Sequence, residues 1–141
     1  MILIDSNVLI DMLGSEGEWK AWSTDAVTHA GAEDDLAITP IVVAEVAPQA
    51  ASLKAFFEGI SGFDVTVAEF GNEAAFAAGL AFNQYRARRR SASEPIRSII
   101  ADFLIGGQAL VTNATIVTRD PRFYRSYFPA VPLITPEARN D

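Results

Sequence analysis

The chain has 141 residues, half of them apolar, which is the size and composition of one compact globular domain over residues 1–141. Eighteen Asp and Glu against eleven Lys and Arg give a formal net charge of −7, which argues against a protein that coats nucleic acid or membrane through bulk charge. The lack of cysteine excludes disulfide scaffolds, thiolate metal sites and cysteine nucleophiles, and a single histidine, His29, argues against a His-based zinc site. No apolar run approaches the ~20 residues that span a bilayer, and the N-terminus lacks a secretory signal, so we expect a cytoplasmic protein.

Short apolar segments alternate with helical patterns along the chain. Strands are predicted at 2–4, 36–39, 64–67, 115–118 and 131–134. Helices are predicted from about residue 7 to Gly14, and over 18–29, 40–47, 50–58, 72–85, 96–111 and 122–127, with Ser6 capping the first and Gly31 stopping the second. Because parallel strands need crossover connections, this order favours an α/β fold in which helices cover both faces of one parallel sheet.

Four carboxylates occupy positions where a surface acid is not expected. Asp5 and Asp120 follow apolar strands, at the end of the sheet where open parallel sheets place ligand crevices. Glu45 and Asp102 lie inside the apolar helical segments 42–47 and 99–105. An ionised carboxylate removed from water is costly unless it is paired or coordinates a cation, and basic residues nearby in the sequence are scarce. The four acids together therefore predict a divalent-metal site.

The donor atoms available at such a site are all oxygens, which favours Mg²⁺, with Mn²⁺ as a substitute. A Mg²⁺ ion held by two or three carboxylates keeps several waters, lowers the pKa of an attacking water and neutralises charge on a phosphate oxygen. This chemistry points toward a nuclease.

The opening Asp5-Ser6-Asn7-Val8-Leu9-Ile10-Asp11, the helix-borne Glu45 and Asp102, and the strand-terminal Thr118-Arg119-Asp120 resemble the acidic signature of PIN-domain ribonucleases. The resemblance covers essentially the whole chain, and the size is similar to the VapC-type toxins of toxin–antitoxin pairs. It implies a three-layer α/β/α fold with a five-stranded parallel sheet of order 3-2-1-4-5. In that order Asp5 and Asp120 meet at the topological switch point.

The resemblance also implies a function and a site. The expected activity is that of a Mg²⁺- or Mn²⁺-dependent endoribonuclease toxin, held in check by a cognate antitoxin and assembled as a homodimer. The metal and catalytic residues would be Asp5, Glu45, Asp102 and Asp120, supported by the polar groups of Asn7 and Thr118. A departure from the family pattern is Gly106-Gly107, where alanine is frequent. A second departure is Pro121-Arg122, where some relatives carry a further acid, which makes a second metal less secure than the first.

Basic residues are concentrated in two places. Five of the eleven lie between residues 86 and 97, where they either complement a helix C-terminus or clamp RNA phosphates. The second group lies around residues 119–125, where interleaved aromatic residues, Tyr124 and Tyr127 among them, could add base stacking, whereas Phe123 and Phe128 are expected in the core. The candidate RNA contacts are Arg86, Arg88, Arg89, Arg90, Arg97, Arg119 and Arg122.

Each acid also has a purely structural interpretation. Asp5 could serve as a helix cap and nothing more, and Glu45 could be a salt-bridged acid of the core. Asp102 could flank the apolar stripe of an amphipathic helix, and Asp120 could begin a turn. Asp11 is expected at the surface. The same holds outside the acids: Trp19 and Trp22 either pack on the domain or line a partner groove, and His29 is expected at the surface.

Two other classes of protein are open at this point. A catalytically silent PIN-like module that binds RNA or protein would not be stabilised by Mg²⁺. A phosphohydrolase or receiver domain would use an aspartyl phosphate, but the first requires Asp-x-Asp where this chain has Asp5-Ser6-Asn7. A receiver requires a lysine near its last strand, and the only lysines are Lys20 and Lys54.

Overall fold

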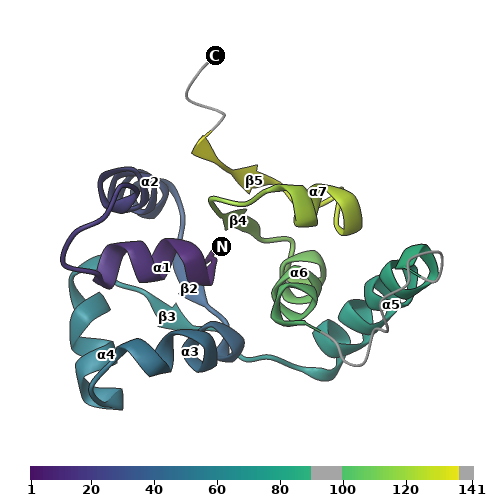
Figure 1. Ribbon diagram of the computed structural model, residues 1–141, viewed down its shortest axis with the longest axis horizontal. Helices are drawn as coiled ribbons and strands as arrows, with labels where there is room; N and C mark the ends of the chain where they lie inside the picture. The colour runs from purple at the N-terminus through teal and green to yellow at the C-terminus, as the bar shows by residue number, and fades with distance from the viewer. Residues whose placement is uncertain (90–99, 137–141) are drawn as a thin grey trace.

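The sheet has five parallel strands in the order predicted. The computed structural model describes residues 1–89 and 100–136. Its strand order is β3-β2-β1-β4-β5, with every neighbouring pair parallel (Figure 1). The strands are β1 (Ile2–Ile4), β2 (Leu36–Ile38), β3 (Thr66–Val67), β4 (Thr115–Val117) and β5 (Leu133–Ile134). The predicted fold class is therefore confirmed.

Helices connect successive strands and cover both sides of the sheet (Figure 1). They are α1 (Ser6–Leu13), α2 (Lys20–Glu33), α3 (Pro40–Val46), α4 (Leu53–Ile60), α5 (Asn72–Arg89), α6 (Ala101–Thr112) and α7 (Arg122–Tyr127), with 3₁₀ turns η1 (Ala47–Gln49) and η2 (Ser61–Phe63). Among the helices of the described residues, none combines the length and apolarity that crossing a membrane requires.

Two predicted helix signals differ from the structure. Asp5, and not Ser6, caps α1, because its side chain accepts a hydrogen bond from the Ser6 backbone N–H. Gly31 does not end α2, which continues to Glu33. A Cβ at Gly31 would lie 2.8 Å from Cδ1 of Leu36, so this glycine serves the packing of α2 against the start of β2. The predicted helix start at residues 96–99 lies outside the described residues.

The central strand β1 places the site. Its three residues are buried, and it is bracketed by β2 and β4, with Leu3 in register with both Ala37 and Ile116. Just beyond the strand, the Asp5 backbone N–H donates to the Val117 carbonyl at 3.0 Å. Because β1 and β4 are parallel neighbours, their carboxyl ends bring residues 5 and 118–120 to the same edge, at the topological switch point.

Helix α6 packs closely on α5 through glycine. A Cβ at Gly107 would lie 2.5 Å from the Ala74 carbonyl oxygen and 2.8 Å from the Ala78 nitrogen. Ring contacts of Phe103, on the same helix, complete this side of the core, and their partners are Phe82, Tyr85, Phe123, Tyr127 and Phe128. The expected core position of Phe128 is confirmed, and Phe123 is half-buried in the same cluster.

Candidate metal-binding site

Asp5 is the buried acid of the site. Only 4% of the residue is exposed, and both carboxylate oxygens accept hydrogen bonds. Oδ1 accepts from the Ser6 N–H at 2.8 Å, and Oδ2 accepts from the Thr118 hydroxyl at 2.7 Å. Burial raises the pKa of Asp5, and the Thr118 and Ser6 hydrogen bonds oppose that rise. Asp5 therefore does cap α1, and it also presents a fixed carboxylate at the strand edge.

A short polar network holds the β4–α7 loop against the first turn of α1. The Thr118 hydroxyl accepts from the Asp120 N–H at 3.1 Å and from Asn7 Nδ2 at 3.4 Å, while it donates to Asp5. The Arg119 N–H in turn donates to Asn7 Oδ1 at 3.2 Å. These contacts orient the loop that carries Asp120, which is the arrangement that a supporting role for Asn7 and Thr118 requires.

Glu45 is less buried than the sequence suggests. The prediction placed apolar residues on every side of its helix, but α3 buries only Val42 and Val46, and Glu45 is exposed. The reason is that α3 is a single short helix packed along one side. Glu45 nevertheless faces the site, because the Ser6 hydroxyl donates to its Oε1 at 2.6 Å.

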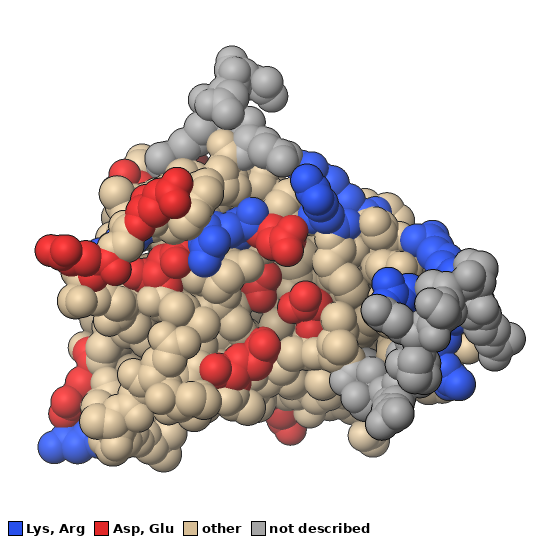
Figure 2. All heavy atoms as spheres, viewed as in Figure 1, with Lys and Arg blue, Asp and Glu red and all other residues tan. Residues whose placement is uncertain are grey.

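Asp102 connects the four acids electrostatically. It lies half-buried in the first turn of α6, whereas Asp120 is exposed at the start of its turn. Burial and the charges of Asp5, Glu45 and Asp120 raise the pKa of Asp102 to about 7. The four carboxylates chosen from the sequence thus act on one another, and Figure 2 shows acidic side chains gathered near the centre of this face. The expectation that all four avoid water is wrong for Glu45 and Asp120.

The donor set suits a hard divalent cation, although it is not closed around one. Within residues 1–89 and 100–136, no group of three or more His, Asp or Glu side chains is arranged to hold a metal ion. In the same ranges, none of the four acids forms an ion pair with Lys or Arg. The available donors are carboxylate oxygens, which Mg²⁺ prefers, and Mg²⁺ needs only one or two of them because it keeps several waters. The negative charges of these acids are not balanced by a protein cation in the described residues. Because Glu45 and Asp120 are exposed, this edge of the sheet is open to solvent on one side.

Tyr124 is a site residue that the sequence analysis missed. The predicted base-stacking role is wrong for this tyrosine, because only 1% of it is exposed. Its hydroxyl approaches the Asp5 carboxylate without completing a hydrogen bond to any described residue. Burial and the charges of Asp5 and Asp102 hold the pKa of Tyr124 well above its ordinary value. Its position four residues after Asp120 in the sequence is the only signal that could have indicated it.

Asp11 and Arg119 form a separate ion pair beside the site. Asp11 was expected at the surface, but its side chain is only 11% exposed. Its carboxylate accepts from Arg119 Nε at 2.6 Å, from Arg119 Nη2 at 3.2 Å, and from the Ser23 hydroxyl at 2.6 Å. The guanidinium also lies over the Trp19 ring, at 5.5 Å from its centroid. Arg119 is therefore built into the domain, so an RNA contact by its guanidinium would have to compete with Asp11.

The tryptophans and His29 match their structural interpretations. Trp19 and Trp22 are half-buried and meet edge to face at 6.2 Å. His29 is exposed. A hollow of about 340 Å³ beside Trp22, bounded by α2 and the end of β5, leaves the partner-groove interpretation a prediction.

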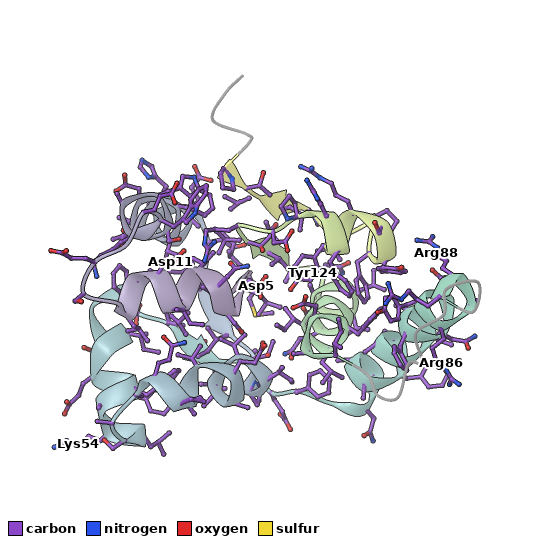
Figure 3. The ribbon with its side chains drawn as sticks, viewed as in Figure 1. Asp5, Asp11, Lys54, Arg86, Arg88 and Tyr124 are labelled. Carbon is purple, nitrogen blue, oxygen red and sulfur yellow. The ribbon has the colours of Figure 1, made fainter. Side chains whose placement is uncertain are left out.

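The described arginines of α5 lie away from the acids. Arg88 lies over the Tyr127 ring at 4.8 Å and Arg89 lies 5.7 Å from the Tyr85 ring. Figure 3 shows Arg86 and Arg88 near the far end of α5, well separated from Asp5. Arg90 and Arg97 lie outside the described residues, and Arg122 is exposed at the start of α7. The arginines of α5 thus complement a helix C-terminus and the aromatic cluster, and RNA contact by any of them stays a prediction.

The chain thus has a five-stranded parallel sheet of order 3-2-1-4-5, and acids from separate segments of the chain lie near one edge of that sheet. The PIN domain family model matches residues 2–129, and the chain belongs to that family. No curated protein matches the sequence closely enough to count as a relative.

Several solved structures share this fold at low sequence identity. VapBC2 from Rickettsia felis, bound to a DNA fragment from its promoter, has a TM-score of 0.65 at 20% identity, covering 96% of this chain and 98% of that one. DNA-bound VapBC from Salmonella typhimurium has a TM-score of 0.62 at 20% identity, covering 95% and 96%. FitAcB from Neisseria gonorrhoeae has a TM-score of 0.58 at 20% identity, covering 97% and 99%.

Proposed function

We propose that this PIN-domain protein is a Mg²⁺- or Mn²⁺-dependent endoribonuclease that acts as the toxin of a toxin–antitoxin pair. The observation that carries the proposal is the coupling of four carboxylates: burial and the charges of Asp5, Glu45 and Asp120 raise the pKa of Asp102 to about 7. Because burial and nearby like charges raise the pKa of Asp5 and of Asp102, a bound cation would stabilise the ionised forms of these two carboxylates. This argues for a site that binds a divalent ion.

The residues of the site have different proposed roles. Asp5, Asp102 and Asp120 would hold the metal. Glu45 would be the fourth carboxylate of the site, and its hydrogen bond from the Ser6 hydroxyl would orient it. When bound, Mg²⁺ or Mn²⁺ would supply an activated water and neutralise charge on the phosphate. The Ser6 hydroxyl donates to Glu45 and the Thr118 hydroxyl donates to Asp5, so both side chains help to orient the carboxylates of the site. The proposed chemistry is phosphodiester hydrolysis in which the metal-activated water is the nucleophile.

The neighbouring structures support an antitoxin as the partner. VapBC2 from Rickettsia felis is a DNA-bound assembly, and another similar structure is a toxin–antitoxin complex from Klebsiella pneumoniae, with a TM-score of 0.62 at 18% identity. By analogy with these complexes, we propose a cognate antitoxin as a partner. The family resemblance adds the proposal of a homodimer in the cytoplasm with RNA as the substrate. Sedimentation of the purified chain alone and with the product of the adjoining gene tests both assemblies.

Cleavage by purified variants tests the activity. The wild type should cut single-stranded RNA with Mg²⁺ or Mn²⁺ and lose that activity in EDTA. Asp5→Asn and Asp120→Asn should fall by roughly 10²–10³-fold or more, because each removes a charge from the site. The matched control is Asp25→Asn, an exposed acid of α2, which should cleave as the wild type does. Undiminished cleavage by both site variants would end the assignment.

Thermal unfolding separates the nuclease from a silent PIN-like module. A ligand that binds only the folded state raises its stability, so Mg²⁺ should raise the Tm of the wild type and not that of Asp120→Asn. Growth arrest on expression in a bacterial host, relieved by Asp120→Asn and by the antitoxin, is the corresponding test in cells. RNA binding with neither a Mg²⁺ shift nor cleavage would favour the silent module.

A further inference from the structure

One buried polar group of the site has no partner and no place in the chemistry above. Tyr124 is among the largest fully buried side chains of the domain, yet its hydroxyl forms no hydrogen bond with any described residue. Leaving a buried hydroxyl unsatisfied is unfavourable, and proteins pair most such groups. The adjacent ring in α7 is a phenylalanine, Phe123, which supplies aromatic packing without a hydroxyl. Packing alone therefore does not require a tyrosine here.

The position of the hydroxyl relates it to the acids. Helix α7 begins at Arg122, two residues after Asp120, and Tyr124 lies in its first turn. Figure 3 shows Tyr124 and Asp5 close to each other at the centre of the molecule, and the charges of Asp5 and Asp102 both act on the phenol. The group thus faces the acidic site from its buried side, away from the solvent that reaches Asp120 and Glu45.

The Asp5 carboxylate has room for one more donor. Oδ1 accepts from the Ser6 N–H and Oδ2 accepts from Thr118, whereas an ionised carboxylate offers roughly four lone-pair positions. A third donor on the buried side would fix the plane of the carboxylate and leave a lone pair directed at the open side. Partners of this kind orient metal ligands and strengthen metal binding.

We propose that Tyr124 is a positioning residue: when a divalent cation binds, its buried hydroxyl donates a hydrogen bond to Asp5 and holds that carboxylate in the orientation that binds the cation. This inference rests on the proposed metal site. It assigns the phenol no proton transfer and no contact with RNA. A small movement of α7 or of the Asp5 side chain would complete the bond, since the two groups already approach each other.

The test compares Tyr124→Phe with Tyr127→Phe, a matched removal of a hydroxyl from the same helix. Calorimetric titration with Mn²⁺, without RNA, should give a dissociation constant about 10-fold or more higher for Tyr124→Phe and an unchanged one for Tyr127→Phe. The Tm of metal-free Tyr124→Phe should equal or exceed that of the wild type, because an unsatisfied hydroxyl has been removed. A structural role would lower this Tm.

A second measurement follows the absorbance of the Tyr124 phenol. Adding Mg²⁺ should change the ultraviolet absorbance of tyrosine in the wild type and in Tyr127→Phe, and this change should be lost in Tyr124→Phe. Unchanged Mn²⁺ affinity in Tyr124→Phe, or a lower metal-free Tm, would overturn the positioning role alone if the wild type still binds Mn²⁺ and cuts RNA. A wild type that binds no Mn²⁺ would overturn both this role and the proposed nuclease.

Discussion

Two groups of carboxylates lie near the carboxyl end of the sheet, and they are satisfied in opposite ways. Asp11 is paired with Arg119 and accepts from Ser23, so each of its oxygens has a protein donor. The acids Asp5, Asp102, Asp120 and Glu45 have no cationic partner in residues 1–89 and 100–136, and their charges act on one another. The two groups are joined in the chain, since Arg119 belongs to the first and Asp120 to the second.

The contrast separates structural charge from functional charge. A half-buried acid that is neutralised by its own guanidinium ties three elements together: α1 through Asp11, α2 through Ser23 and the β4–α7 loop through Arg119. The other four acids lack a cationic partner in the described residues, so a bound cation would explain their repulsion even though Asp5 and Glu45 also accept hydrogen bonds. Burial alone does not distinguish these cases, because Asp11 is less exposed than Asp120. The partners do.

The largest expected effect is a reversal between the two groups. Asp102→Asn should lower metal-dependent cleavage by roughly 10²–10³-fold and raise the metal-free Tm, because it removes a repelling charge. Asp11→Asn should do the opposite: it should lower the metal-free Tm and leave the Mg²⁺-induced rise in Tm intact. Cleavage assays and thermal melts in EDTA and in Mg²⁺ measure both. Equal loss of stability in the two variants would remove the distinction.

Packing beneath Asp102 gives the next largest effect. Gly107→Ala would place a Cβ against the Ala74 carbonyl and the Ala78 nitrogen, which are backbone atoms that cannot rotate away. We expect a loss of about 1–3 kcal/mol in unfolding free energy, measured by urea titration. Because α6 must shift to relieve the clash, cleavage should fall while the Asp11–Arg119 pair is kept.

Gly79→Ala is the matched control in the neighbouring helix. A Cβ at Gly79 would meet no atom within 4 Å, and alanine favours a helix over glycine by about 1 kcal/mol. This variant should therefore be more stable than the wild type. A Gly107→Ala variant that gains as much stability as Gly79→Ala would show that α5 and α6 are not in the close contact described.

The sequence identified the parts of the site that strand ends determine. Asp5 and Asp120 each follow an apolar strand, and parallel pairing brings such ends together, so their meeting was predictable from local pattern. Glu45 and Asp102 were identified because acids interrupt apolar helices. The burial of Glu45 was overestimated, because the side of a short helix that faces solvent depends on what packs against it.

Contacts between residues that are far apart in the sequence could not be predicted from local sequence patterns. The pairing of Asp11 with Arg119 joins residues 108 positions apart, and no local signal distinguishes it from two surface charges. The same is true of Tyr124, whose ring was read as a stacking platform because arginines surround it in sequence. The role of Gly107 became definite only once the Ala74 and Ala78 backbone was placed against it.

A double-mutant cycle measures the paired group itself. Asp11→Ala, Arg119→Ala and the double variant should show a coupling energy of about 0.5–3 kcal/mol in unfolding free energy, because the pair is largely shielded from water. The exposed pair Lys54–Glu58 in α4 is the control, and its coupling should be about 0.5 kcal/mol or less. A cycle in which the Asp11–Arg119 coupling is no larger than that of the α4 pair would contradict the structural role given to Arg119.

The last prediction concerns the pH dependence of the unpaired group. The pKa of Asp102 is raised from 3.8 to about 7 in the folded protein, so the folded state binds a proton more tightly than the unfolded state. Stability without metal should therefore fall as pH rises between about 4 and 7, since ionising Asp102 is easier in the unfolded chain. Denaturant titrations in EDTA measure this slope, which should be reduced in Asp102→Asn and kept in Asp11→Asn. Mg²⁺ should oppose the fall, because the cation binds the ionised form, and a slope that Asp102→Asn leaves unchanged would mean that another group sets it.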